Sequence, residues 1–199
     1  MHLELDSIEK NGTWELCDLP VGKRAIGTKW VYKLKHRADG CIERHKARLV
    51  AKGYAQREGI DYEKTCAPTS RMTTICTVVA LAAHKGWHVH HLDIKTAFLN
   101  GDLKEEVYVW QPLGFVKKGA EHQVYRLHKA LYGLKQAPRA WYQKVHAYLV
   151  AHGFKNSPTE STLYVYKDGA DLLILNLYVD DLLVTGPNED KILAFIADL

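Results

Sequence analysis

Leu175-Asn176-Leu177-Tyr178-Val179-Asp180-Asp181-Leu182-Leu183-Val184-Thr185-Gly186 places two adjacent carboxylates between two apolar runs of strand length. Both runs are rich in β-favouring side chains, so the stretch predicts a tight hairpin with Asp180 and Asp181 at or beside its turn. Two neighbouring anions beside a sheet core are unfavourable without cations. Mg²⁺ suits such a site when few carboxylates act together with substrate phosphates. The alternative is a solvated turn, where Asp-Asp is common.

Composition places the chain among ordinary globular proteins. It has 199 residues, of which 47% are apolar and 25% charged, enough for one core or one core with a small second lobe. No apolar run approaches the roughly 20 residues of a membrane helix, and the N-terminus does not resemble a signal peptide. Because the four cysteines show no CxxC spacing, we expect reduced thiols in a cytoplasmic or nuclear protein that is not secreted.

Positive charge is concentrated in two segments. The net charge is +4, but residues 23–57 hold eleven Lys/Arg against Asp39 and Glu43, a balance of +9 that leaves −5 elsewhere. Residues 122–159 hold six Lys/Arg and no Asp or Glu. Basic segments around an acidic centre suit a polyanion that passes a metal site. The alternative is that these cations only coat solvent-exposed faces.

Periodicity and turn residues predict alternating helices and strands. We expect helices at 1–10, 71–85, 138–153 and from 187 onward, and strands at 14–16, 29–35, 42–50, 87–92, 107–110, 124–127, 163–166, 172–178 and after Asp181. On the 42–50 strand, Arg44, Lys46 and Arg48 share one face, which predicts a hairpin that grips phosphate. The helix at 71–85 is apolar on nearly every side, so we expect it to be buried against a sheet.

Asp93 is the third candidate carboxylate, because it ends the apolar strand at 87–92. Antiparallel or mixed pairing of this strand with the one before Asp180, in the middle of one sheet, would bring Asp93, Asp180 and Asp181 to one edge. Such a cluster can hold two divalent ions about 3.5–4 Å apart, an arrangement suited to nucleotidyl transfer. The alternative is that these aspartates only cap strand ends.

Four motifs resemble those of copia-type long-terminal-repeat (LTR) retrotransposon reverse transcriptases, in that family's order. They are Lys46-Ala47-Arg48-Leu49-Val50-Ala51-Lys52-Gly53, Leu92-Asp93-Ile94-Lys95-Thr96-Ala97-Phe98-Leu99-Asn100-Gly101, Leu131-Tyr132-Gly133-Leu134-Lys135-Gln136-Ala137-Pro138-Arg139-Ala140-Trp141 and Tyr178-Val179-Asp180-Asp181. The resemblance implies a reverse transcriptase domain of a Pol polyprotein. It also implies an RNA-directed DNA polymerase that uses two Mg²⁺ ions, with Mn²⁺ as an alternative ion.

The resemblance also implies roles for individual residues. Asp93 and Asp180 would be the principal catalytic metal ligands, with Asp181 completing the cluster, and Tyr178 and Val179 would open their motif. Phe98, after Ala97, would lie under the sugar of the incoming nucleotide and exclude a 2′-hydroxyl; the alternative is a core aromatic.

Residues of the other two motifs would bind the nucleotide. Lys46 or Arg48 would grip the triphosphate, and the sequence leaves open which of them does so. Tyr132, Gly133 and Lys135 would line the nucleotide and the template strand, where glycine allows close backbone approach.

The implied fold is α+β, with reverse transcriptase fingers and an antiparallel palm sheet that has helices packed on one face. Residues 1–199 would be a partial domain that lacks the thumb and RNase H. Fingers-like parts would lie at about 11–70 and 104–140, and the palm at about 71–103 and 141–199. The implied partners are an RNA or DNA template–primer, dNTPs and the rest of the Pol polyprotein, including integrase and RNase H, with no membrane. The implied location is a retrotransposon particle in the cytoplasm, or the nucleus.

Other classes of function receive less support from the sequence. His88 and His90 have the HxH spacing of zinc ligands, but no third ligand motif accompanies them, so we expect solvent- or core-facing histidines. No GxxxxGK[ST], GxGxxG or GxSxG motif is present. Two alternatives remain: a catalytically inactive or domesticated fragment that only binds nucleic acid, and a palm-fold nucleotidyl transferase or cyclase that acts on free nucleotides.

Overall fold

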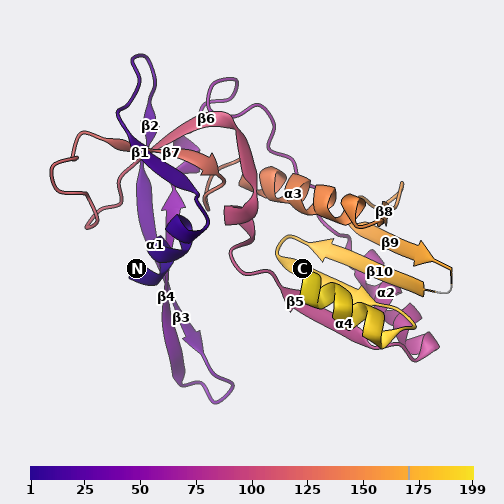
Figure 1. Cartoon of the computed structure of the whole chain (residues 1–199). Coiled ribbons are helices and arrows are strands. Elements are labelled where there is room, and N and C mark those ends of the chain that lie inside the picture. The colour runs from indigo at the N-terminus through magenta and orange to yellow at the C-terminus, as the bar shows by residue number, and fades with distance from the viewer. Residues whose placement is uncertain (170) are drawn as a thin grey trace. The chain divides into compact units, whose positions relative to one another are not determined.

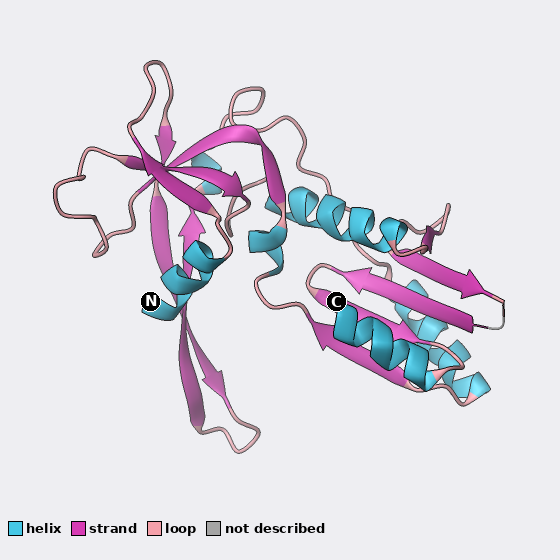
Figure 2. Ribbon diagram, viewed as in Figure 1, coloured by secondary structure: helices cyan, strands magenta, loops and turns pink. Residues whose placement is uncertain are grey.

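The computed structural model describes residues 1–169 and 171–199. Helices and strands both contribute, so the chain has the mixed α and β content that the sequence predicts (Figures 1 and 2). The chain divides into two compact units: unit 1 is Met1–Cys66 with Phe98–Trp141, and unit 2 is Ala67–Ala97 with Tyr142–Leu199. Each unit has its own sheet. Among the described residues, no helix has the length and apolar character needed to cross a membrane.

A four-stranded sheet lies at the centre of unit 1, in the order β1-β7-β6-β2. Its strands are Trp14–Cys17 (β1), Ala25–Ile26 (β2), Asp102–Trp110 (β6) and Val124–Lys129 (β7). β1, β7 and β6 pair antiparallel, whereas β2 pairs parallel with β6. The sequence predicts β1, β6 and β7 but misses β2, because two residues are too short to show a period.

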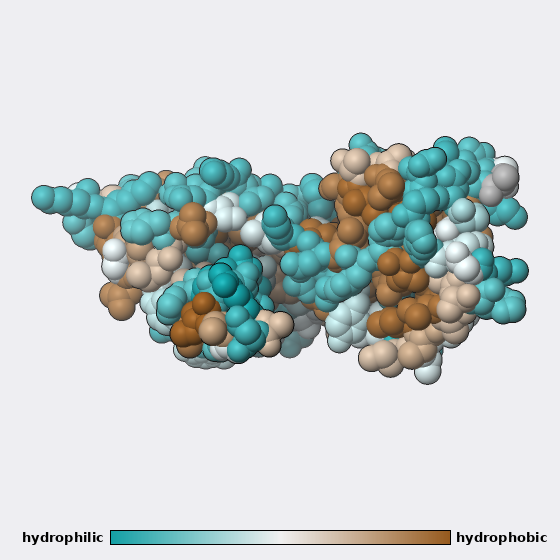
Figure 3. Space-filling view, turned by 90° about the horizontal axis from the view of Figure 1, so that it is seen from below, coloured by the Kyte–Doolittle hydropathy of each residue, from teal (hydrophilic) through white to brown (hydrophobic). Residues whose placement is uncertain are grey.

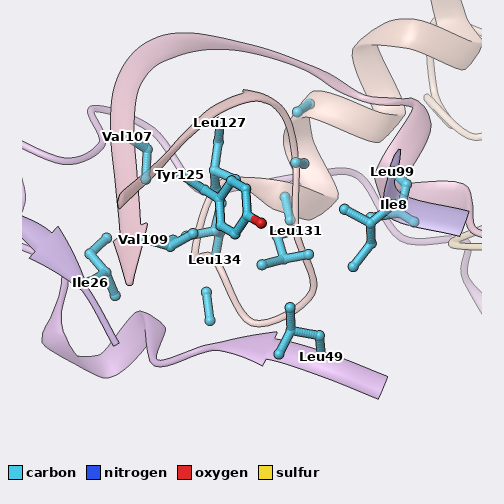
Figure 4. Packing of buried hydrophobic residues seen from close by; sticks show 14 residues of the cluster. Ile8, Ile26, Leu49, Leu99, Val107, Val109, Tyr125, Leu127, Leu131 and Leu134 are labelled. Carbon is cyan, nitrogen blue, oxygen red and sulfur yellow. The ribbon is translucent and has the colours of Figure 1, made fainter. Parts of the chain in front are cut away.

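The helix α1 (His2–Lys10) shares a buried apolar core with this sheet (Figure 4). Ile8 of α1 is completely buried, as is Leu49 from the neighbouring strand β4 (Ile42–Ala51). The other large members of the core are Ile26, Leu99, Val107, Val109, Tyr125, Leu127, Leu131 and Leu134. Since segments far apart in the sequence meet here, burial of this apolar surface stabilises unit 1 as a whole.

A long antiparallel hairpin of unit 1 presents a row of cations. Its strands are Thr28–His36 (β3) and Ile42–Ala51 (β4). Lys33 lies directly opposite Lys46, Lys35 opposite Arg44, and Val31 opposite Arg48. Directly opposed side chains share a face, so the structure confirms the predicted cationic face of β4 and adds two lysines from β3. Like charges in such cross-strand pairs repel each other and destabilise the hairpin.

Unit 2 contains a five-stranded antiparallel sheet in the order β5-β11-β10-β9-β8. Its strands are Val89–Asp93 (β5), Lys155–Asn156 (β8), Leu163–Asp168 (β9), Asp171–Tyr178 (β10) and Asp181–Thr185 (β11). The predicted pairing of the Asp93 strand with the strand before Asp180 is wrong. β10 already pairs with β9 and β11, so β5 pairs with β11 and lies at the edge of the sheet.

Helices contact both faces of this sheet, which differs from the prediction of helices on one face. They are Met72–Lys85 (α2), Ala137–Ala151 (α3), whose residues from 142 onward belong to unit 2, and Glu189–Asp198 (α4). His146 of α3 contacts Tyr164, which lies opposite Leu175 and therefore shares its face. Ile75 of α2 lines a cavity with Asn176, whose side chain points to the opposite face.

The helix α2 is less buried than its apolar sequence predicts. Its end is as predicted, because Gly86 takes the left-handed conformation with φ of 68° and its N–H bonds the carbonyls of the last turn. However, only Val78 and Ala82 of α2 are buried, while Met72 is 71% exposed and Val79 is 41% exposed. Figure 3 shows that hydrophobic residues reach the surface in the part of the molecule that contains unit 2. Full burial of α2 is therefore a wrong prediction.

Candidate active site

Asp93 and Asp181 form a cross-strand pair at the end of the β5–β11 ladder. The ladder continues one step further, because the backbone N–H of Ile94 donates to the carbonyl of Asp180 at 2.8 Å. The sheet of unit 2 therefore brings the backbones of all three predicted catalytic aspartates next to one another. This juxtaposition follows from the register of two strands that are almost 90 residues apart in sequence.

The turn between β10 and β11 has an unusual backbone. Tyr178 pairs with Asp181, so Val179 and Asp180 form a two-residue loop, as the sequence predicts. Val179 has φ of 56°, and a positive φ is a genuine outlier for a β-branched residue. Among residues 1–169 and 171–199, the only other non-glycine residue with positive φ is Thr96, three positions after Asp93. Strained backbone therefore lies beside both acidic motifs, a distribution typical of functional sites.

The carboxylate of Asp181 contacts a histidine that lines the same cavity. Its Oδ1 lies 2.8 Å from Nε2 of His91, whose side chain is 66% exposed, whereas that of Asp181 is 41% exposed. The cavity has a volume of about 180 Å³ and is lined by Ile75, His91, Asn176, Tyr178, Asp181 and Leu183. Asn176 is 1% exposed, and no described group bonds its Nδ2 atom. The acidic end of the hairpin thus adjoins a small hollow with apolar walls.

The aspartates supply the right donors for a hard cation, but the described side chains do not form a finished metal cage. Carboxylate oxygen is the ligand that Mg²⁺ prefers, and Mg²⁺ is usually held by one or two carboxylates together with substrate phosphates. Within residues 1–169 and 171–199, no group of three or more His, Cys, Asp or Glu side chains is arranged to hold a metal ion. Asp93, Asp180 and Asp181 thus supply the donor type that Mg²⁺ prefers, without a preformed site among the described side chains.

Three predicted nucleotide-binding residues meet in unit 1. The guanidinium carbon of Arg48 lies 4.9 Å from the ring centroid of Tyr132, a cation–π distance. On the same aromatic ring, Phe98 packs at 5.0 Å between centroids with an interplanar angle of 57°. Phe98 is only partly buried and packs against the edge of the core, so the structure leaves part of its ring accessible.

Lys46 lies in the densest part of the cationic row. Burial lowers the pKa of its ammonium group, and Arg48, Lys35 and Arg44 lower this pKa further by repulsion. Glu4 of α1 acts in the opposite direction on Lys46 and also accepts a hydrogen bond from the Leu49 N–H at 3.2 Å. Burial raises the pKa of Glu4 above its ordinary value despite these cations. An anionic ligand would relieve the repulsion in this row.

The loop that carries Tyr132 lies directly against β4. The Ala51 N–H donates to the Tyr132 carbonyl at 2.7 Å. Gly133 has φ of 88°, and a Cβ atom there would overlap the Ala51 carbonyl and the Val50 side chain. Glycine is thus required at 133 both by the backbone conformation and by the close approach of the two segments.

Lys135 is held at both ends. Its backbone N–H donates to Oε1 of Gln56 at 2.8 Å. Its ammonium group donates to the hydroxyl of Tyr62 at 3.0 Å and lies 4.8 Å from the centroid of the same ring. A lysine side chain that is exposed would otherwise sample many rotamers. Lys135 is therefore an exposed cation with a defined position.

Comparison with known proteins identifies the family. Residues 11–199 match the family model described as reverse transcriptase (RNA-dependent DNA polymerase). This chain belongs to the reverse transcriptase family. The match confirms the prediction from the four motifs, and it covers all four motifs and the whole of unit 2.

Relatives of this reverse transcriptase chain include polyproteins of transposons. It is 44% identical over 200 residues to the retrovirus-related Pol polyprotein from transposon TNT 1-94 of Nicotiana tabacum, covering 100% of this chain and 15% of that protein. It is 44% identical over 187 residues to the Pol polyprotein from transposon RE2 of Arabidopsis thaliana, covering 94% of this chain and 13% of that protein. With the Gag-Pol polyprotein of transposon Ty1-BL from Saccharomyces cerevisiae, it shares 30% identity over 192 residues, or 94% and 10% of the two chains.

The remaining sequence-predicted residues of the reverse transcriptase chain lie as follows. Ala97 is buried and is the last residue of the unit 2 segment 67–97, so it precedes Phe98 across the boundary between units. His88 and His90, which were set aside as zinc ligands, both contact the carboxylate of Glu189, at 3.3 and 2.8 Å. The His88 side chain is 78% exposed, as expected of a solvent-facing histidine, whereas the His90 side chain is only 25% exposed.

Sequence reasoning missed Gln56, Tyr62 and Gln136, which support the Tyr132–Lys135 loop. Tyr62 bonds a residue 73 positions away, and Gln56 bonds Gln136 across 80 positions. No local period marks such contacts, because each joins two loops. The only signal was the presence of two glutamines and a tyrosine near the family motifs.

Proposed function

We propose that this chain catalyses template-directed DNA synthesis, with unit 2 as palm and unit 1 as fingers. The oxygen of a primer 3′-hydroxyl attacks the α-phosphorus of a dNTP, a new P–O bond forms, and the bond to pyrophosphate breaks. The observation that carries the proposal is the pairing of Asp93 with Asp181, with Asp180 bonded to the next residue of β5. The family match gives the reaction class.

The aspartates would hold Mg²⁺, or alternatively Mn²⁺, together with the phosphates of the nucleotide. Asp93 and Asp180 are the principal ligands, and Asp181 completes the acidic group. When bound, two such ions stabilise the charge on the attacking and leaving oxygens. The protein contributes position: the cross-strand register fixes Asp93 against Asp181, and the tight turn fixes Asp180 relative to both.

Unit 1 would bind the nucleotide. Arg48 and Lys46 neutralise the triphosphate, and the cation–π contact with Tyr132 favours Arg48 as the residue with the more defined position. Phe98, which packs on the Tyr132 ring, screens the sugar for the absence of a 2′-hydroxyl. Gly133 and Lys135 complete the loop against the nucleotide and the template strand.

The proposed partners follow from this chemistry and from the names of the relatives. An RNA or DNA template–primer would lie along the cationic hairpin, held mainly by phosphate contacts. The relatives are Pol or Gag-Pol polyproteins of transposons, so we propose a place within such a polyprotein, beside integrase and RNase H. The proposed location is a retrotransposon particle in the cytoplasm, or the nucleus.

The test is primer extension on an oligonucleotide-primed RNA template with Mg²⁺ and dNTPs. Asp180→Asn should abolish extension, because the metal site loses a charge. Asp190→Asn is the matched control, since Asp190 is an exposed acidic residue in the first turn of α4, and it should leave extension unchanged. Equal activity of the Asp180→Asn variant and the wild type would contradict the proposed site.

A second candidate function is nucleic-acid binding without catalysis, and the cationic hairpin is the observation that favours it. This second candidate predicts salt-sensitive binding of template–primer without primer extension, both by this chain and by a longer polyprotein that contains it. Primer extension by this chain or by the longer polyprotein would exclude it.

A further inference from the structure

Beside the loop that carries Tyr132 and Gly133, an exposed lysine is tied to a buried tyrosine. Tyr62 is only 8% exposed, yet its hydroxyl accepts a hydrogen bond from the Lys135 ammonium group at 3.0 Å. The ammonium also lies 4.8 Å from the Tyr62 ring centroid. The hydroxyl and the ring face therefore act on one cation from one side, which leaves the remaining ammonium protons available to another acceptor.

A buried network of side-chain amides bonds both the backbone of Lys135 and the backbone of Asp61, the residue before Tyr62. Nε2 of Gln56 donates to Oε1 of Gln136 at 2.9 Å, and Nε2 of Gln136 donates to the Asp61 carbonyl at 2.9 Å. The same Gln56 side chain accepts the Lys135 N–H. Gln136 is 1% exposed and Gln56 is 5% exposed, so these bonds form away from water, where an unpaired polar group is costly.

The carboxylate of Asp61 extends the network on the side of Tyr62. It accepts the Arg57 N–H at 2.6 Å and a hydrogen bond from Arg24 at 3.0 Å. Because Asp61 immediately precedes Tyr62, its backbone and side-chain bonds fix the position of the phenol. The same hydrogen-bond network therefore fixes the backbone of Lys135 and the position of the Tyr62 ring, which the Lys135 ammonium group contacts.

We propose that Tyr62 is a positioning residue for nucleotide binding, which holds the Lys135 ammonium group ready for a triphosphate oxygen. This inference rests on the proposed function, because it takes Lys135 to contact the nucleotide. A free lysine loses rotamer freedom when it binds phosphate, and Tyr62 removes that freedom in advance. Tyr62 itself does not touch the nucleotide; it acts through Lys135.

The experiment is a double-mutant cycle on binding of dTTP with Mg²⁺, measured by titration calorimetry with the full chain. Lys135→Ala should weaken dTTP binding roughly tenfold or more, the loss typical of a charge-assisted hydrogen bond. Tyr62→Phe keeps the ring and removes the hydroxyl, and it should weaken binding roughly threefold to tenfold. In the Lys135→Ala background, Tyr62→Phe should have no further effect, because its action passes through Lys135.

Tyr54→Phe is the matched control, since Tyr54 lies shortly before Tyr62, in the short 3₁₀ helix Gly53–Ala55, and is 76% exposed. It should leave dTTP binding unchanged in both backgrounds. A purely structural role of Tyr62 would lower the unfolding temperature and weaken binding by the same factor with or without Lys135, and that result would overturn the proposal. Absence of dTTP binding to the wild-type chain, or of any effect of Tyr62→Phe, would overturn it as well.

Primer extension separates this proposal from the proposed function. A chain that binds dTTP with the expected coupling but does not extend a primer would contradict polymerase activity and support the role of Tyr62. A chain that extends a primer but shows no coupling would support the polymerase and contradict the role of Tyr62.

Discussion

Asp93 and Asp181 lie directly opposite each other on neighbouring antiparallel strands. Like charges in directly opposed cross-strand positions repel each other, and a bound cation would relieve this repulsion. The adjacent Val179 adds backbone strain at the same end of the sheet. Stability is thus reduced where the proposed chemistry takes place, as is common at functional sites.

Asp93→Asn should raise stability and remove activity together. Without Mg²⁺, neutralising one member of the pair should increase the free energy of unfolding by about 0.5 kcal/mol. Primer extension should fall by at least about 10²-fold, the loss typical of one electrostatic group in an active site. Adding Mg²⁺ should raise the unfolding temperature of the wild type more than that of the variant. An equal response of both proteins to Mg²⁺ would count against Asp93 as a metal ligand.

Val179→Gly should be stabilising, although glycine normally weakens a β-structure. A positive φ costs a residue with a Cβ atom about 1–2 kcal/mol, and the greater chain entropy of glycine offsets about 0.5–1 kcal/mol. The expected net gain is about 0.5–1 kcal/mol, measured by urea unfolding. Val165→Gly in β9, at a position of regular strand pairing with Ile174, should instead be destabilising. A loss of stability in both variants would show that Val179 is not strained.

Gly133→Ala should destabilise unit 1 by about 2–5 kcal/mol, since it combines a positive φ with overlap against the Ala51 carbonyl. Gly40→Ala is the control, because Gly40 has φ of +83° but no atom within 4 Å of the added Cβ. At Gly40 only the cost of the positive φ remains, so the free energy of unfolding should fall by about 1–2 kcal/mol. Denaturant unfolding measures both variants, and equal losses would contradict the close approach of the two segments.

Glu4 should make stability fall as the pH rises. Burial raises the pKa of Glu4 above its ordinary value of 4.5 in the folded chain. Below pH 4.5 the carboxyl is protonated in both states, and its contribution is fully present. As the pH rises through the folded pKa, the buried carboxylate ionises and that contribution is lost.

Glu4→Gln removes this titration and retains an oxygen that can accept the Leu49 N–H. Its unfolding temperature relative to the wild type should therefore rise between pH 4.5 and neutral pH and be nearly constant below that interval. Glu9→Gln, on the same helix, is the comparison. The opposite trend for Glu4→Gln would mean that attraction to Lys46 and Arg48 outweighs burial.

Local patterns of the sequence predicted most of the secondary structure. Gly86 correctly marked the end of α2, and the paired aspartates correctly marked the β10–β11 turn. Both the helix end and the turn could be predicted because each depends on the conformational preferences of a few adjacent residues. The family motifs added the candidate residues Asp93, Arg48 and Tyr132, whose roles remain predictions.

Longer-range features were not predictable in the same way. The position of β5 at the sheet edge depends on competition among strands for β10, which no single strand pattern reveals. The apolar residues of α2 gave no indication of which side would be covered. The Gln56–Gln136 pair joins two loops whose sequences carry no period, so only the folded chain reveals it.

The opposed cations of the β3–β4 hairpin give added salt two contrary effects on the same segment. Salt screens the repulsion of Lys33 from Lys46 and of Lys35 from Arg44, so the isolated hairpin becomes stiffer as ionic strength rises. Salt also weakens binding of any polyanion to that row. The hairpin should therefore be most loosely formed under the conditions in which the proposed binding of nucleic acid would be tightest, and a bound strand would order the hairpin in place of salt.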